Sequence, residues 1–335
     1  MDPIEALRQI AFELERSGAP TYRVQAFRRA AQVLDGLPAG ELSQRIQAGT
    51  LRALKGIGDT TAQVIIEADR GEQPGYLAAL LGDQPPSPPD ELRAGLRGDC
   101  HTHSDWSDGG SPPLEMAEAA RALGHEWIAL TDHSPRLTVA SGLSAERLRA
   151  QLKLVRELNE KLAPFRILTG IEVDILDDGS LDQREDLLRQ LDVVVASVHS
   201  KLRMPAGPMT RRMVAAIRNP QVTVLGHCTG RMLGGRARRP ESEFDPGAVF
   251  RACAQTGVAV EINCRPERQD PPDRLLTLAA DAGCVFAIDT DAHAPGQLDW
   301  LGSGTARATR AGITADRVIN TGDAASVAGR RARHP

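Results

Sequence analysis

The sequence is poor in aromatic residues, in cysteine and in long apolar runs. Only 3% of the 335 residues are Phe, Trp or Tyr, so the core must be aliphatic and side chains that stack on nucleic-acid bases are scarce. The five cysteines are odd in number and show no Cys-x-x-Cys spacing, which argues against a disulfide framework and a structural zinc knuckle. No apolar run approaches ~18 residues, and the charged, amphipathic start of the chain does not resemble a signal peptide. We therefore predict a cytoplasmic protein that does not enter a membrane.

The chain also lacks a strong excess of charge. Its formal net charge is −4, with 41% hydrophobic and 25% charged residues, which is typical of a soluble globular protein. The overall charge gives no support for wholesale nucleic-acid binding, so a DNA site would have to be a local patch. The length is sufficient for two or three domains with a sizeable core.

Apolar residues recur at helical spacing through the first 80 residues, which predicts a small all-α domain over 1–80. A stretch rich in proline and acidic residues follows, and we expect 81–96 to be a linker. The predicted helices cover residues 3–18, 21–36, about 40–48, and a pair within 51–68.

The last two of these helices are joined by Gly56, Ile57 and Gly58, a turn typical of a helix-hairpin-helix motif. Backbone N–H groups at such a turn can bind a DNA phosphate without reading the base sequence. A plain helical hairpin whose glycines only make the turn is the alternative. We predict that these three residues contact DNA.

From residue 97 to the end, short β-branched runs alternate with helical segments, which predicts a βα-repeat fold with a parallel sheet over 97–335. The seven predicted strands are 97–101, 126–131, 166–173, 192–198, 221–226, 257–262 and 284–289. The predicted helices between them include 112–123, 144–163, 181–190, 209–219, 245–256 and 272–282.

Nearly every predicted strand ends in a side chain that can bind a metal. His101 and His103 lie on one side of an extended segment, and Asp108 follows in the next loop. Any one histidine could be an ordinary half-buried imidazole, but six at successive strand ends indicate a metal cluster, because parallel strands of a barrel bring these ends to one mouth. His125 and His334 lie outside this pattern, and we expect them to be exposed. The nine candidate ligands are His101, His103, Asp108, His133, Glu172, His199, His227, Asp291 and His293.

These motifs resemble the PHP (polymerase and histidinol phosphatase) family, over about residues 97–325. The resemblance is closest to the PHP domain of bacterial X-family DNA polymerases, through EINCRPERQD at 261–270, GHCTGR at 226–231 and LGSGTAR at 301–307. It implies a distorted seven-stranded (βα)7 barrel with three divalent metal ions. Mn, Zn and Fe all suit imidazole and carboxylate ligands.

The resemblance also implies how the ligands are shared. One metal takes His101, His103, Glu172 and Asp291; the second shares Glu172 and takes His199 and His227; the third takes Asp108, His133 and His293. Ions that share a carboxylate lower the pKa of a bound water and neutralise phosphate oxygens, so no serine or cysteine nucleophile is needed. We expect Cys100 and Cys228, which lie beside ligands, to be neutral packing residues.

Residues around the barrel mouth are candidates for substrate contacts. Asp108 and Glu172 are expected to act in catalysis through the metals, and the resemblance implies that Asn263 and Arg268 line the cleft and contact substrate phosphate. Basic residues in the loops after the predicted fourth and fifth strands suit a phosphodiester backbone, although an ordinary solvated loop is the alternative. The predicted DNA contacts in these loops are Lys201, Arg231 and Arg236.

Residues 1–80 resemble the small N-terminal domain of X-family DNA polymerases, including TYRVQAFRRAA at 21–31. In that family a lysine on the second hairpin helix supports a lyase activity, but Val64 stands at the matching position, and the only lysine before residue 150 is Lys55. The nucleotidyl-transfer domain, of ~100 residues or more, has no room between the two regions. We expect neither lyase nor polymerase activity.

We predict a metal-dependent phosphoesterase that acts on DNA ends or damaged sites, most simply as a 3′–5′ exonuclease or 3′-end-processing enzyme in DNA repair. DNA is the expected partner, with DNA-repair proteins as further partners. One alternative is a small-molecule phosphatase of the histidinol-phosphatase type. The other is a non-catalytic DNA-binding scaffold, against which the complete ligand set argues.

Overall fold

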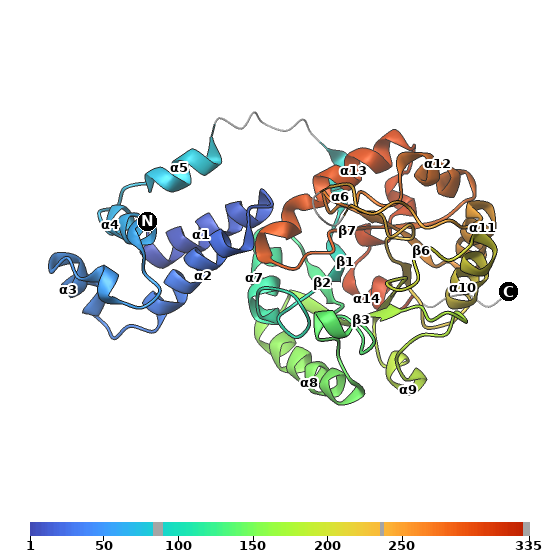
Figure 1. Ribbon diagram of the computed structural model, residues 1–335, viewed down its shortest axis with the longest axis horizontal. Helices are drawn as coiled ribbons and strands as arrows, with labels where there is room; N and C mark the ends of the chain where they lie inside the picture. Colours follow the sequence, from blue (N-terminus) through green and yellow to red (C-terminus); the bar gives the residue numbers. More distant parts are fainter. Residues whose placement is uncertain (83–89, 235–237, 331–335) are drawn as a thin grey trace. The chain divides into compact units, whose positions relative to one another are not determined.

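The computed structural model describes residues 1–82, 90–234 and 238–330, and the chain divides into two compact units, Met1–Pro88 and Pro89–Pro335 (Figure 1). The first unit is all-helical, and the second contains a seven-stranded sheet with helices around it. None of the described helices combines the length and the apolar composition that a membrane crossing requires.

The first unit is built around one apolar cluster to which each of its longer helices contributes. The Asp2 carboxylate caps its first helix by accepting the backbone N–H groups of Ile4 and Glu5. The predicted helices are present, but the first helix of the hairpin pair is only one 3-10 turn, because Leu54 is extended and ends it. The elements are α1 (Pro3–Arg16), α2 (Thr21–Asp35), α3 (Glu41–Gln47), η1 (Leu51–Ala53), α4 (Asp59–Asp69) and α5 (Gly75–Leu81).

The predicted linker 81–96 is not structureless at its C-terminal end. Helix α6 (Glu91–Gly95) forms there, and the carboxylate of Asp90 caps it by accepting the backbone N–H of Arg93. Leu92 is buried in the largest apolar cluster of the second unit. The proline-rich segment 83–89 lies outside the described residues.

The second unit confirms the predicted α/β barrel. Its strands are all parallel and follow the order β1-β2-β3-β4-β5-β6-β7. A parallel bridge between Thr102 and Ala292 brings the two ends of the sheet together, so the barrel is nearly closed. The strands are β1 (Gly98–Thr102), β2 (Trp127–Leu130), β3 (Arg166–Asp174), β4 (Val193–Ser197), β5 (Val224–Leu225), β6 (Ala259–Asn263) and β7 (Phe286–Asp289).

Helices cover the outside of this sheet (Figure 1). The helix expected over 181–190 is reduced to α9, and the strand expected over 221–226 is reduced to β5. The helices α13 and α14 were not predicted, although the first residues of α13 belong to the LGSGTAR motif. The helices are α7 (Pro113–Ala122), α8 (Ala145–Leu162), α9 (Glu185–Leu188), α10 (Ala206–Ile217), α11 (Pro246–Thr256), α12 (Asp273–Asp281), α13 (Leu301–Arg310) and α14 (Ala324–Ala328). Short 3-10 turns are η2 (Thr138–Ala140), η3 (Pro295–Trp300), η4 (Ala315–Arg317) and η5 (Ile319–Thr321).

Alternation along the strands determines which side chains enter the barrel. Leu168 and Ala259 belong to one apolar cluster, whereas Ile262 on the same strand as Ala259 belongs to another that includes the covering helices. Since alternate residues of a strand face opposite sides, Glu172 and Glu261 share the inner face with Leu168 and Ala259. Two carboxylates are therefore placed inside the barrel, near its C-terminal end.

The expectation that His125 is exposed was wrong. The residue is only 4% exposed, and neither ring nitrogen has a hydrogen-bond partner within the described residues. Burial, with a smaller contribution from Arg93, lowers the pKa of the imidazole to about 4. His334, the other histidine outside the pattern, lies outside the described residues.

The buried His125 predicts a specific loss of stability in mild acid. The unfolded state takes up a proton near pH 6.5, whereas the folded state does so only near pH 4, so stability falls as the pH falls through this window. The His125→Leu variant lacks this term. We expect the difference in unfolding free energy between wild type and variant to shift by ~3 kcal/mol in favour of the variant between pH 7 and pH 4. Urea unfolding at a series of pH values measures it, and a pH-independent difference would contradict the assignment.

Candidate metal centre

The C-terminal ends of the barrel strands bring the predicted ligands to one place. His101 lies in β1, and Glu172 lies in β3, whereas His199 and His227 follow directly after β4 and β5. Parallel strands share one end of the barrel, so residues far apart in the sequence meet there. The ring centroids of His101 and His227 are 6.0 Å apart, and those of His199 and His227 are 5.3 Å apart.

Glu172 lies at the centre of this group and is fully buried. Its Oε1 is 3.2 Å from Nε2 of His199 and 3.0 Å from Nε2 of His227. Its Oε2 is 3.4 Å from Nε2 of His101 and 2.8 Å from Nδ1 of His133. Nε2 of His103 is a further 3.7 Å from the same Oε2, so one carboxylate faces five imidazoles from four different strand ends.

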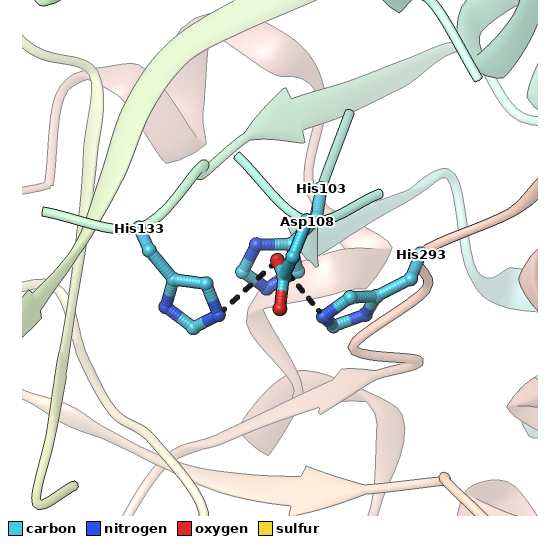
Figure 2. A group of neighbouring side chains, drawn as sticks. All are labelled: His103, Asp108, His133 and His293. Atoms are coloured by element: carbon cyan, nitrogen blue, oxygen red, sulfur yellow. Dashed lines mark ion pairs between the residues drawn. The ribbon is translucent and has the colours of Figure 1, made fainter. Parts of the chain in front are cut away.

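Asp108 forms the outer side of the cluster (Figure 2). Its Oδ1 is 3.5 Å from Nε2 of His133 and 3.4 Å from Nε2 of His293, and the His103 ring lies between these two imidazoles. The side chain of Asp108 is 36% exposed, so this side of the cluster is open to solvent. Asp291 completes the set, with its Oδ1 3.3 Å from Nε2 of His103.

The chemistry of these side chains fits a metal centre. Several of their nitrogen and oxygen atoms are buried without a hydrogen-bond partner, among them Nε2 of His101, Nε2 of His103 and both oxygens of Glu172. Buried polar atoms that lack partners are costly, and a divalent cation would satisfy them together. Three groups have ligand atoms within 4.8 Å of one another: His103, Asp108, His133 and His293; His101, His103 and Glu172; and His133, Glu172 and His199.

The charges within the cluster also suit a cation. Burial raises the pKa of the Glu172 carboxyl, but the surrounding histidines outweigh it and hold the pKa well below its usual range. Burial, followed by His293 and His133, lowers the pKa of His103 well below its usual value. Glu172 is therefore anionic and His103 neutral, the protonation states that metal ligands require. Burial lowers the pKa of His101 and His133, but Glu172 and the other carboxylates outweigh it and raise the pKa of both, so a metal ion would displace protons from these two imidazoles.

A buried carboxylate that the sequence analysis missed holds the loop that carries Asp108. Asp132 accepts hydrogen bonds from the backbone N–H of Ser104 at 2.8 Å, from its hydroxyl at 2.6 Å and from the Ser107 hydroxyl at 2.5 Å. Gln151 of α8 donates a further hydrogen bond to it. The sequence signal that could have identified Asp132 is its position directly before His133, which follows the end of β2.

The predicted substrate contacts of the barrel differ in how accessible they are. Asn263 is fully buried and donates to Oδ2 of Asp291 at 3.2 Å, so it lies behind a candidate ligand. Arg268 lies on the same carboxylate, with its Nε 3.2 Å from Oδ2 of Asp291 and its side chain 16% exposed. Lys201 is exposed and pairs with Asp177.

Arg231 and Arg236 are the two predicted DNA contacts in the loop after β5, and the structure describes only the first of them. Arg231 donates to the backbone carbonyls of Arg268 and Gln269 and is 3.7 Å from a Glu241 oxygen. Arg236 lies outside the described residues. Arg239, in the same loop, is half-buried. Burial lowers the pKa of its guanidinium, and the positive charge of the nearby Arg268 lowers this pKa further.

The thiols beside the ligands have the environment of packing residues. Cys100 and Cys228 are buried, and burial raises the pKa of both thiols well above the usual value. A thiol in this state is neutral at physiological pH and a poor nucleophile. The structure therefore favours the packing role expected for them.

In the helical unit, Gly56 adopts a φ of +106°, a conformation that favours glycine. A Cβ at this position would lie 3.1 Å from the side-chain carbons of Arg29, so α2 closely supports the hairpin. Gly58 has an ordinary extended backbone, and its N–H donates to the Thr61 hydroxyl at 2.9 Å. Val64 is only 1% exposed and packs in the core of the unit.

Comparison with known protein families agrees with both units. Residues 1–70 match the helix-hairpin-helix domain, and residues 99–265 match the PHP domain. The chain is also 31% identical to a probable phosphatase of Thermoanaerobacter sp. (strain X514), in a match that covers 67% of this chain and 89% of that protein. The chain belongs to the PHP family and carries a helix-hairpin-helix domain at its N-terminus.

Two further similarities concern the barrel. A protein of Bacillus subtilis (strain 168) named DNA polymerase/3′-5′ exonuclease PolX is 40% identical over 225 residues, which are 67% of this chain but only 39% of that protein. A crystal structure of histidinol phosphate phosphatase from Lactococcus lactis, complexed with zinc, L-histidinol and phosphate, is 20% identical with a TM-score of 0.49 and covers 65% of this chain and 95% of that one.

If the cluster holds metal, zinc should stabilise the folded chain. Binding to the native state alone stabilises it by ~2.7 kcal/mol when the free metal is a hundredfold above its Kd. We expect Zn²⁺ to raise the melting temperature of metal-free protein, and Glu172→Gln to lose most of this rise because five imidazoles then lack their shared anion. Differential scanning calorimetry with and without Zn²⁺ measures both. An equal rise in the variant would show that the zinc binds elsewhere.

Proposed function

We propose that this protein is a metal-dependent phosphoesterase that hydrolyses phosphodiester or phosphomonoester bonds at DNA 3′ ends, as a 3′–5′ exonuclease or 3′-end-processing enzyme in DNA repair. The observation that carries the proposal is the buried Glu172 carboxylate, which five strand-end imidazoles face, with Asp108 on the open side. The predicted set of three ions, of Mn, Zn or Fe, is part of the proposal.

Bound divalent ions would supply an activated water and neutralise the phosphate oxygens. The residues of the chain would hold the ions, position the loop of Asp108 and bind the phosphate. The buried imidazoles and Glu172 hold the centre, and Asp132 keeps the loop of Asp108 in place. Arg268, next to Asp291, is positioned to pair with a phosphate oxygen at the edge of the cluster.

Three observations support DNA as the substrate. The helix-hairpin-helix domain offers a second place for a DNA phosphate, and the 40%-identical relative carries 3′-5′ exonuclease in its name. Beside the barrel mouth, a cavity of about 830 Å³ is lined by four arginines and two glutamates, of which Glu241 pairs with Arg231 and Arg274, while Arg238 and Arg239 also line it. Arginines suit a phosphodiester backbone, so the cavity would suit the strand that leads away from the cleaved bond.

A small-molecule phosphatase is the second candidate, and one observation favours it. The 31%-identical probable phosphatase matches over 89% of its own length but over only 67% of this chain, so that relative has little beyond the matched part. The two candidates differ in whether the substrate is a polymer. They are separated by offering both substrates to the same preparation.

The decisive experiment is metal-supplemented hydrolysis of an end-labelled DNA duplex beside histidinol phosphate. We expect DNA shortening from the 3′ end, and Asp108→Ala should reduce it at least about a hundredfold, since a ligand on the open side is lost. Asp105→Ala is the matched control, because Asp105 is an exposed carboxylate of the same loop, and it should retain wild-type activity. Phosphate release from histidinol phosphate alone would establish the second candidate instead.

The hairpin can be tested separately from hydrolysis. In Gly56→Ala the alanine must adopt a positive φ and its Cβ lies 3.1 Å from side-chain carbons of Arg29, so the turn is strained. We expect the Kd for a labelled duplex to rise roughly tenfold, measured by fluorescence anisotropy at fixed salt in an Asp108→Ala background. Gly71→Ala, at the other end of α4, is the control because its φ is +78° and a Cβ there meets nothing within 4 Å. Equal affinity of both variants would remove the hairpin from the DNA interface.

A further inference from the structure

Glu261 is a fully buried carboxylate inside the barrel to which the sequence analysis assigned no role. It lies on β6, within the EINCRPERQD motif. Its Oε1 is 2.5 Å from Nδ1 of His101. Its Oε2 accepts hydrogen bonds from the backbone N–H of His227 and, at 3.2 Å, from the side-chain amide of Asn263.

The contact with His101 determines which ring nitrogen faces the cluster. A carboxylate can only accept hydrogen bonds, so Nδ1 of His101 must carry the proton. The other nitrogen, Nε2, then presents its lone pair, and it lies 3.4 Å from Oε2 of Glu172. An imidazole that is oriented through its far nitrogen is a common arrangement around metal ions.

The same carboxylate links several strands that carry candidate ligands. It contacts the His101 ring from β1 and the backbone of His227 after β5. Asn263, which donates to Glu261, also donates to Oδ2 of Asp291 at 3.2 Å. Glu261 is therefore in contact with two candidate ligands and is connected to a third, Asp291, through Asn263.

Glu261 itself is poorly placed to be a ligand. Both of its oxygens already accept hydrogen bonds, and Oε1 lies at the nitrogen of His101 that points away from Glu172. It belongs to none of the three groups whose ligand atoms converge within the described part of the chain. Its role is exerted through His101.

We propose that Glu261 is a positioning residue of the metal centre, which holds the His101 ring in the orientation that presents Nε2, and not Nδ1, to a metal ion. The inference rests on the metal centre of the proposed function but not on the identity of the substrate. It makes a barrel residue outside the nine predicted ligands a determinant of metal affinity.

The first test compares Glu261→Gln with wild type in Zn²⁺ affinity. An amide has one accepting and one donating side, so it cannot accept from both His101 and the backbone of His227. We expect the affinity, measured by competition with a chromophoric chelator, to fall by roughly 10- to 100-fold. A folded variant with wild-type affinity would overturn the proposal.

Asp192→Asn is the matched control. Asp192 precedes β4 at the opposite end of the barrel and accepts two hydrogen bonds from Thr169, both at 2.9 Å. It therefore undergoes the same acid-to-amide change without facing a candidate ligand. We expect this variant to lose stability but to keep its Zn²⁺ affinity, and an equal loss of affinity in the control would show that the Glu261 effect is only a general loss of stability.

The second test needs no variant. In Zn²⁺-loaded wild-type protein, ¹⁵N NMR of the imidazoles should show His101 with its proton on Nδ1 and none on Nε2, and a ring with its proton on Nε2 instead would overturn the proposal even if Glu261→Gln fails to fold. The two hypotheses can also fail separately. Wild type that binds no Zn²⁺ would remove the metal centre of the proposed function, whereas equal binding by wild type and Glu261→Gln would remove only the role of Glu261.

Discussion

The architecture of this protein depends on a carboxylate that is buried without a hydrogen-bond partner. Glu172 is fully buried, and its two oxygens face five imidazoles but no hydrogen-bond donor with suitable geometry in the described chain. An arrangement of this kind is costly in a folded protein unless another charge enters. The barrel closes around it where β1 meets the segment after β7, and His103 and Asp291 lie next to this closure. The closure of the barrel and the convergence of the candidate metal ligands therefore both involve the same buried carboxylate.

Much of this arrangement could be predicted because it follows from local rules. Apolar periodicity gave the helices and strands, and parallel strands in a barrel necessarily bring their C-terminal ends together. Residues as distant as His101 and Asp291 could thus be grouped without any knowledge of their distance. The structure places all nine candidate ligands in one cluster, while the division among three ions remains a prediction.

The residues that support the ligands could not be predicted in the same way. The partner of Glu261 is 160 residues away in the sequence, and no local pattern distinguishes its carboxylate from a ligand. Arg231 was predicted to contact DNA from its position in a basic loop, but its guanidinium donates to backbone carbonyls, which only the three-dimensional arrangement reveals. His125 was expected to be exposed because it lies in a loop before a strand, yet that loop packs into the unit. In each case the tertiary environment, not the residue type, determines the role.

The choice between a DNA end and a small phosphate ester must be made at the rim of the barrel. The buried imidazoles and Glu172 would hold the same ions for either substrate, so they carry no information about its size. Three features around the cluster can distinguish the two substrates. They are the open side at Asp108, the arginine beside Asp291, and the cavity with several arginines that the loop after β5 helps to form. A small ester would use only the first two of these, whereas a polymer extends beyond the cleaved bond and needs further phosphate contacts. A preference for DNA as the substrate would therefore depend on the rim arginines and the hairpin, and not on the interior of the barrel.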